Sequence, residues 1–162
     1  MYPPAYAVGP FVRTCSGHDV VSQHGCLRWL DEHPDRSVLY VCFGSGGTLS
    51  TEQTAELAAG LEASGQRFLW VVRFPSGDGH SPISYLPEGF VERTRGRGLT
   101  VPLWAPQCGW NSPLEAVAAG VPTLAWPLYA EQRMNAAMLS ERVGLALRRY
   151  DSHTKSLYVR AL

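Results

Sequence analysis

The stretch that decides the fold is "SVLYVCFGSGGTLSTEQTAELAAGLEASGQRFLWVVRF", residues 37–74. It opens with a continuous apolar run at 37–43 and closes with a second one at 67–74. Continuous hydrophobicity over the length of a strand predicts burial on both faces, as in a parallel sheet. The stretch therefore predicts two buried parallel strands.

A helix is predicted between these two strands, over residues 50–65. Ser50 followed three positions later by Gln53 is typical of a capping box, and Gly65 provides the stop. Two parallel strands joined by a helix form a right-handed βαβ unit in nearly all proteins. The fold class predicted from this unit is α/β.

The same alternation continues on both sides of residues 37–74. Patterning predicts short helices at 26–34 and within 86–98, strands at 99–104, 121–127 and 145–149, and helices at 112–120 and 131–144. Strands that alternate with helices predict a Rossmann-like parallel sheet with helices on both faces. Residues 75–84 show no periodicity and are expected to form a surface loop.

Composition excludes several classes of function. The 162 residues are 45% hydrophobic and 17% charged, with 14 basic and 14 acidic residues, so the chain is globular and carries no net charge. A neutral chain does not favour nucleic acid as a partner. No apolar run approaches the roughly 20 residues of a membrane span. Neither the cysteines nor the histidines have metal-binding spacing, and a reducing cytoplasmic location without a metal is expected.

The glycine-rich loop "FGSGGT", residues 43–48, follows the first strand. Its backbone N–H groups suit a phosphate, but a tight turn that needs glycine is an equal alternative. A dinucleotide site would require a third glycine where Leu49 stands, and a carboxylate near Arg73. A P-loop would require a lysine that the loop lacks. Both of these nucleotide motifs are therefore excluded.

Residues 104–132, "WAPQCGWNSPLEAVAAGVPTLAWPLYAEQ", carry the most specific signal. They resemble the C-terminal signature of the plant secondary-product UDP-glycosyltransferases, and residues 28–73 and 85–99 resemble the same family. The similarity is closest to its hydroquinone (phenol) glucosyltransferase branch. The resemblance implies the C-terminal domain of a two-domain enzyme that transfers glucose from UDP-glucose to a phenolic hydroxyl with inversion. UDP-glucose would be a co-substrate, and no cofactor is expected.

The resemblance also implies which residues hold the nucleotide. Trp104 would stack on the uracil. The backbone groups of Ala105 would form hydrogen bonds with the edge of the same base. Gln107 would lie near the ribose, and Glu115 would accept hydrogen bonds from both ribose hydroxyls. The diphosphate would be contacted by Ser45, Asn111 and Ser112. The transferred sugar would be contacted by Trp126, Glu131 and Gln132. Gln132 goes with glucose more often than with galactose in this family.

A structural role is the alternative at several of these positions. Glu115 lies three residues after Ser112, so it fits a capping box, and Asn111 is also a good cap residue. Trp126 suits a packed core, and Glu131 suits the first turn of a helix. Only the occurrence of all these residues in the family's order favours the functional interpretation.

The direct junction of Gln107 and Cys108 departs from the family's pattern. The family has a helix and a strand ending in a histidine at this point, and a parallel crossover needs a dozen or more residues. The domain is therefore expected to lack one βα step. The neighbouring strands must then pair across the gap or leave backbone groups unpaired, which costs about 1–3 kcal/mol for each buried group.

Three segments are expected: a lead-in at 1–25, an incomplete UDP-sugar-binding domain at 26–150, and a tail at 151–162 that does not resemble the family. No histidine matches the family's catalytic base, which is expected in an N-terminal half together with the acceptor pocket. The chain alone is thus predicted to be inactive. A truncated, non-catalytic product that binds nucleotide weakly or not at all is the alternative, and a plain α/β interaction module is a third hypothesis.

Overall fold

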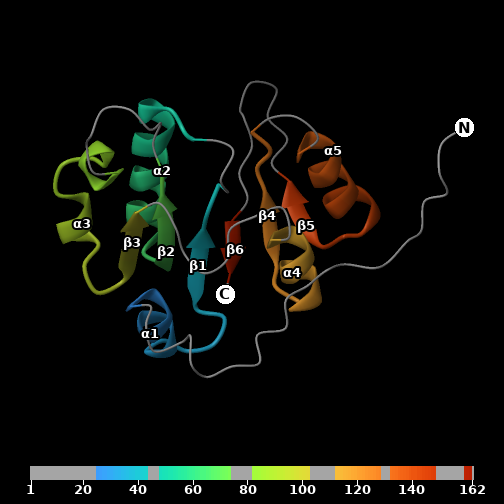
Figure 1. The fold of residues 1–162 in the computed structure, drawn as a ribbon, viewed down its shortest axis with the longest axis horizontal. Helices are drawn as coiled ribbons and strands as arrows, with labels where there is room; N and C mark the ends of the chain where they lie inside the picture. The colour runs from blue at the N-terminus through green and yellow to red at the C-terminus, as the bar shows by residue number, and fades with distance from the viewer. Residues whose placement is uncertain are drawn as a thin grey trace, which may run out of the picture.

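The computed structural model describes residues 25–43, 48–73, 82–102, 112–128, 132–148 and 159–161. Within these ranges the chain forms a six-stranded sheet in the order β3-β2-β1-β6-β4-β5, with helices packed around it (Figure 1). The strands are β1 (Val38–Val41), β2 (Arg67–Val72), β3 (Gly98–Pro102), β4 (Thr123–Ala125), β5 (Ala146–Arg148) and β6 (Val159–Ala161). The α-helices are α1 (Gly25–Asp31), α2 (Thr51–Ser64), α3 (Phe90–Arg93), α4 (Ser112–Ala118) and α5 (Gln132–Ala137).

The βαβ unit predicted over residues 37–74 is confirmed as β1, α2 and β2. The hydroxyl of Ser50 accepts the backbone N–H of Gln53 at 3.2 Å, and the Gln53 side chain accepts the N–H of Ser50 at 3.1 Å. These two bonds form the predicted capping box at the start of α2. Gly65 ends the helix in the left-handed region with φ of 66°, where glycine has no steric penalty.

The predicted parallel sheet is confirmed, with one addition. β1 pairs with β2, β2 with β3 and β4 with β5, all in parallel. β6 was not predicted: it lies between β1 and β4 and runs antiparallel to both. The sequence left two arrangements open at this point, pairing across the gap or unpaired backbone. The structure has a third, in which a strand from another part of the chain fills the space.

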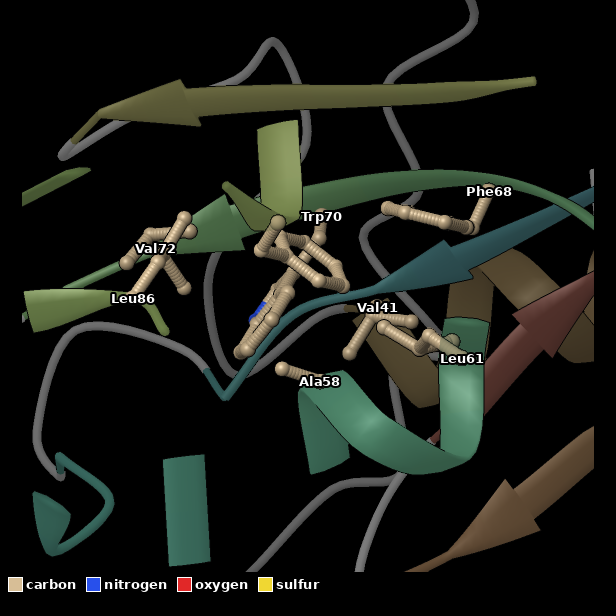
Figure 2. Packing of buried hydrophobic residues seen from close by; sticks show 8 residues of the cluster. Val41, Ala58, Leu61, Phe68, Trp70, Val72 and Leu86 are labelled. Atoms are coloured by element: carbon tan, nitrogen blue, oxygen red, sulfur yellow. The ribbon is translucent and has the colours of Figure 1, made fainter. Parts of the chain in front are cut away.

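Helices cover both faces of the sheet, as predicted. On one face, Phe68 and Trp70 of β2 pack with Ala58 and Leu61 of α2 and with Phe90 of α3. Figure 2 shows the side chains of β1, β2 and α2 in this cluster directed toward one another. On the other face, Val38, Tyr40, Leu69 and Val71 pack against Cys26, Trp29 and Leu30 of α1. The alternation along β1 and β2 thus buries both sides of each strand.

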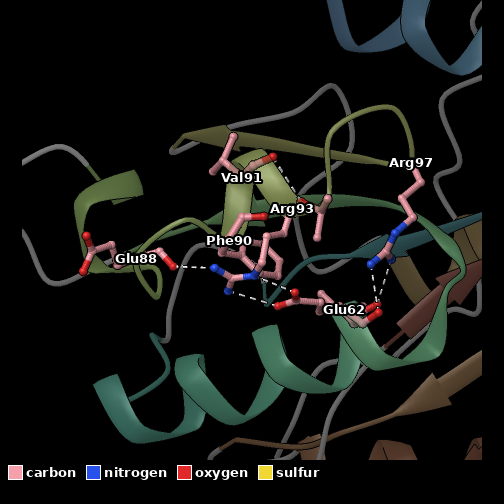
Figure 3. Close-up of polar contacts among 8 residues, drawn as sticks. Glu62, Glu88, Phe90, Val91, Arg93 and Arg97 are labelled. Carbon is pink, nitrogen blue, oxygen red and sulfur yellow. Dashed lines mark hydrogen bonds and ion pairs between the residues drawn. The ribbon is translucent and has the colours of Figure 1, made fainter.

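Polar contacts fix α3 against the C-terminal end of α2 (Figure 3). The guanidinium of Arg93 donates to both carboxylate oxygens of Glu62, at 2.6 and 3.2 Å, and holds the pKa of Glu62 below its usual range. Arg97 donates to the backbone carbonyls of Leu61 and Glu62 at 3.2 and 2.8 Å. These carbonyls lie in the last turn of α2, where the helix dipole makes a nearby cation favourable.

The remaining elements match the predictions in type and differ at their ends. The predicted loop at 75–84 contains, in its described part, the start of a 3₁₀ turn, η2 (Pro82–Tyr85). The helix predicted at 131–144 begins as α5 and continues as a π-helix, η3 (Met138–Arg142). Gly120 and Gly144, the predicted stops after α4 and η3, have φ of 62° and 68°. Periodicity therefore located these helices but not the change in their hydrogen-bond pattern.

Candidate functional site

The candidate site lies at the carboxyl edge of the sheet, where parallel strands of an open α/β sheet present ligand-binding loops. Three of the ten predicted residues have described side chains: Glu115, Trp126 and Gln132. Ser112 is the first residue of α4. The other six predicted positions lie outside the described residues: Ser45, Trp104, Ala105, Gln107, Asn111 and Glu131.

Trp126 directly follows Ala125, the last residue of β4, and is half-buried. Its ring packs edge-on against Phe43, with the ring centroids 5.8 Å apart and an angle of 88° between the planes. Its indole Nε1 is buried and has no hydrogen-bond partner among the described residues. An indole N–H is only a donor, and buried donors in native proteins nearly always have an acceptor. The site thus holds a donor in need of an acceptor.

Phe43 is a residue of this site that sequence reasoning missed. It follows β1 by two positions, and it brings the loop after β1 into contact with the loop after β4. The two strands are not neighbours, because β6 lies between them. The available signal was an aromatic residue at the end of a buried apolar run, directly before the glycine-rich loop.

Gln132 is the first residue of α5, and its side chain contacts the backbone of Leu128, two residues after Trp126. Its Oε1 accepts the backbone N–H of Leu128 at 2.8 Å. The bond fixes the side chain six positions after Trp126, on the same connection between β4 and α5. A glutamine amide also carries an NH₂ group that can donate to a ligand oxygen.

Glu115 lies in the first turn of α4 and is partly exposed. Its backbone carbonyl accepts the N–H of Ala119 at 2.9 Å, so the residue is part of the regular helix. The N-terminal turn of a helix favours negative charge. A carboxylate at this place is consistent both with a cap and with a ligand contact.

The glycine-rich loop leads to the N-terminus of α2, which carries a carboxylate of its own. The hydroxyl of Ser50 and the backbone N–H of Glu52 donate to the Glu52 carboxylate and hold its pKa below the usual range. A bound anion at this helix end would meet that negative charge.

A small pocket of about 10 Å³ lies beside this loop, at the carboxyl ends of β1 and β2. Its walls come from the ends of both strands and the start of α2, with these residues: Phe43, Thr48, Leu49, Thr54, Trp70, Val71, Val72 and Arg73. Trp70 belongs to the core cluster as well. This pocket thus lies on the core of the first βαβ unit and shares Phe43 with the candidate site.

Two kinds of feature are absent from the described part of the chain. No helix there has the length and hydrophobicity to cross a membrane. Among the same residues, no three histidine, cysteine or acidic side chains are grouped closely enough to bind a metal ion.

Comparison with known sequences gives one consistent family. The family model described as "UDP-glucoronosyl and UDP-glucosyl transferase" matches residues 18–156. "UDP-glycosyltransferase 72B1" of Arabidopsis thaliana is 51% identical over 172 residues, and "Hydroquinone glucosyltransferase" of Rauvolfia serpentina is 50% identical over 172 residues. Both matches cover 90% of this chain but 36% of the relative, so the chain spans about a third of these proteins.

The matches are longer than the part of this chain that they cover. A match over 172 residues that takes in 90% of the 162 residues of this chain means that the relative carries residues that the chain lacks.

Solved structures give the same result. The crystal structure of TcCGT1 in complex with UDP has a TM-score of 0.83 at 45% identity, with 92% of this chain and 37% of that chain covered. Phytolacca americana UGT2, complexed with UDP-2fluoro-glucose and pterostilbene, has a TM-score of 0.76 at 49% identity. That match covers 96% of this chain and 35% of that chain.

Proposed function

Because the chain belongs to the family of UDP-glucoronosyl and UDP-glucosyl transferases, we propose that it binds the sugar donor of a glucosyltransferase whose acceptor is a phenolic hydroxyl. Its fold is the Rossmann-like C-terminal domain of these two-domain enzymes, and the proposal includes the loss of one βα step at the junction of Gln107 and Cys108. UDP-glucose is the proposed co-substrate, and no metal or cofactor takes part in the proposed reaction.

The observation that carries this proposal is the unpartnered indole N–H of Trp126. It lies directly after β4, at the edge of the sheet where this fold binds ligands. A sugar hydroxyl supplies the acceptor that the indole lacks, and the NH₂ group of Gln132 is available to donate to a second sugar oxygen. Together these two groups would orient the glucose, with Glu131 beside them.

The remaining predicted residues would hold the nucleotide. Trp104 offers an aromatic face to the uracil, and Glu115 offers two acceptor oxygens to the ribose hydroxyls. Hydroxyl and amide donors at Ser45, Asn111 and Ser112 would stabilise the charge that develops on the UDP leaving group. The backbone of Ala105 and the side chain of Gln107 would complete the contacts to the uracil and the ribose.

The acceptor side of the reaction requires a catalytic base and an acceptor pocket, and the family's residues for these match no residue of this chain. In an inverting transfer, a base takes the proton of the phenolic hydroxyl, whose oxygen attacks the anomeric carbon while UDP leaves from the opposite face. The proposed role of residues 1–162 is to bind and orient the donor. We also propose a cytoplasmic location, because the four cysteines have no paired or regular spacing in the sequence.

Residues 1–162 alone are expected to transfer no glucose from UDP-glucose to hydroquinone. Catalysis needs a base within hydrogen-bond reach of the acceptor, about 2.6–3.2 Å, and an acceptor held in line with the sugar. A turnover assay against a no-protein control measures this, and product above that control would refute the prediction. The positive control is a parent-length protein with the residues between Gln107 and Cys108 restored. If that protein also transfers no sugar from any UDP donor, the proposed function is wrong.

Replacing Trp126 with phenylalanine is expected to weaken the binding of UDP-glucose by about two- to tenfold. Phenylalanine keeps an aromatic ring beside Phe43 but removes the indole donor, and one neutral hydrogen bond contributes about 0.5–1.5 kcal/mol. The affinity for UDP, which lacks the sugar, should not change. Calorimetry with both ligands measures the difference, and equal losses for UDP and UDP-glucose would contradict the sugar contact.

The missing βα step favours a second candidate, a non-catalytic product of the same family that binds nucleotide weakly or not at all. The family's diphosphate histidine belongs to the segment that is absent between Gln107 and Cys108. Losing one charge-assisted contact costs about 1.5–3 kcal/mol, or about ten- to a hundredfold in affinity. Calorimetry with UDP separates the candidates, since a measurable dissociation constant supports donor binding and an absence of heat supports the inactive product.

A further inference from the structure

β6 is inserted in the sheet against the direction of the other described strands. On one side it pairs with β1, through Leu39 with Ala161, Tyr40 with Arg160 and Val41 with Val159. On the other side it pairs with β4, through Thr123 with Arg160 and Leu124 with Val159. A strand with partners on both sides is a central strand, although this one comes from the end of the described chain.

β6 also joins two halves of the sheet. β1, β2 and β3 form one parallel half, and β4 and β5 form the other. In the described strands, the order passes from β1 to β4 only through β6, as Figure 1 shows. Val38 and Val41 of β1 are buried, so an unfilled space beside this strand would leave backbone groups of the core without partners.

The place that β6 takes is the place of the missing strand. Doubly wound sheets of this kind have the strand order 3-2-1-4-5-6, with the strands parallel. The observed order, β3-β2-β1-β6-β4-β5, fits it when β4 and β5 take the fifth and sixth places and β6 takes the fourth. The fourth strand is the one that would follow β3, and the junction of Gln107 and Cys108 lies between β3 and β4.

The chain can reach this place without a long crossover. Arg148 ends β5 and Val159 begins β6, and both lie near the same end of β4, because Leu147 and Val159 pair with Leu124 from opposite sides. Two strand spacings separate β5 from β6, which is about 10 Å. The connecting residues 149–158 span up to about 33 Å when extended. An antiparallel strand fits here because β5 ends and β6 begins at the same edge of the sheet.

We propose that the space between β1 and β4 is a binding site for an extended peptide strand, and that residues 159–161 of this chain occupy it in place of the missing fourth strand. β6 runs antiparallel to its neighbours because residues 159–161 follow β5 in the chain, whereas the missing fourth strand would follow β3. Backbone pairing carries the interaction, as in other cases where an extended segment is added to a sheet. The proposal concerns the sheet alone and does not depend on nucleotide binding.

The test compares the unchanged chain with two point variants and one shortened chain. The amide hydrogen exchange of β1 and β4 is measured by NMR. Arg160→Pro removes an N–H from the inserted strand, whereas Arg160→Thr changes the side chain and keeps that N–H. We expect the proline variant, and a chain shortened to residues 1–150, to exchange the β1 and β4 amides that face β6 at least about tenfold faster. The threonine variant and the amides between β2 and β3 should stay unchanged.

Adding a peptide of residues 151–162 to the shortened chain should restore slow exchange at β1 and β4. If the shortened chain unfolds, the comparison of Arg160→Pro with Arg160→Thr still decides, because both variants lose the arginine side chain and only proline removes the backbone donor and restricts φ. Equal exchange in the full and shortened chains would overturn the proposal, and so would equal effects of the two point variants. Protection that is lost on dilution, together with a dimer in gel filtration, would place the strand in a second copy and overturn the assignment to the same chain.

Discussion

Replacing Trp70 with alanine is expected to lower the free energy of unfolding by about 3–5 kcal/mol, the range for truncating a large buried aromatic side chain. Trp70 lies in β2 and is 2% exposed. Its ring packs at a right angle on Phe90, with the centroids 6.0 Å apart, within the cluster that α2 and α3 cover. Alanine would leave a cavity under the pocket at the carboxyl ends of β1 and β2.

Denaturant unfolding of Trp70→Ala beside Trp70→Phe and Met134→Ala measures this effect. Trp70→Phe keeps an aromatic partner for Phe90 and should cost clearly less. Met134 is 70% exposed on α5, and its replacement should change the stability by less than about 0.5 kcal/mol. A loss for Trp70→Ala no larger than that for Met134→Ala would show that β2 is not the centre of the core. Because the free energy of unfolding of a domain is only about 5–15 kcal/mol, this loss is a large fraction of the total stability.

Replacing Glu115 with alanine is expected to weaken the binding of UDP by about a hundredfold. The proposed contact consists of hydrogen bonds from two ribose hydroxyls to a carboxylate, and charge-assisted bonds contribute about 1.5–3 kcal/mol each. A loss of about 3 kcal/mol corresponds to about a hundredfold in the dissociation constant. The matched control is Glu56→Ala, which removes the same charge from an exposed position on α2.

Measuring stability together with affinity separates the two roles that Glu115 can have. A helix cap contributes about 1 kcal/mol to stability. If Glu115→Ala lowers the free energy of unfolding by that amount but leaves UDP affinity unchanged, the residue is a cap and the ribose contact is wrong. Loss of affinity with little change in stability, and no effect of Glu56→Ala, supports the ribose contact.

Local sequence patterns were sufficient to predict most of the helices and strands. The capping box of Ser50 and Gln53, the stop at Gly65 and the buried runs of β1 and β2 depend on residues within a few positions of each other. The same holds for the order of motifs in residues 104–132, which identified the family. The change from α5 to the π-helix η3 was not predictable in this way, because η3 has only 5 residues, about one turn, which is too short to show a hydrophobic period of its own.

The candidate site was predictable as a set of residues but not as an arrangement. Trp126 was predicted to be either a sugar contact or a core aromatic, and the structure shows features of both: its ring packs on Phe43 while its Nε1 has no partner among the described residues. Phe43 and Trp126 are far apart in the sequence. Their contact depends on how β1 and β4 are spaced in the sheet, which no local pattern encodes.

The sequence by itself determined the α/β class, the family and the glycine stops of three helices, and it predicted the loss of one βα step. Only the tertiary structure decided what fills the resulting space. The three residues of β6 have no periodicity or cap that predicts a strand, and their extended conformation depends on hydrogen-bonding edges at β1 and β4, far away in the chain. The physical reason is that backbone donors and acceptors of buried strands need partners, whichever segment can reach them.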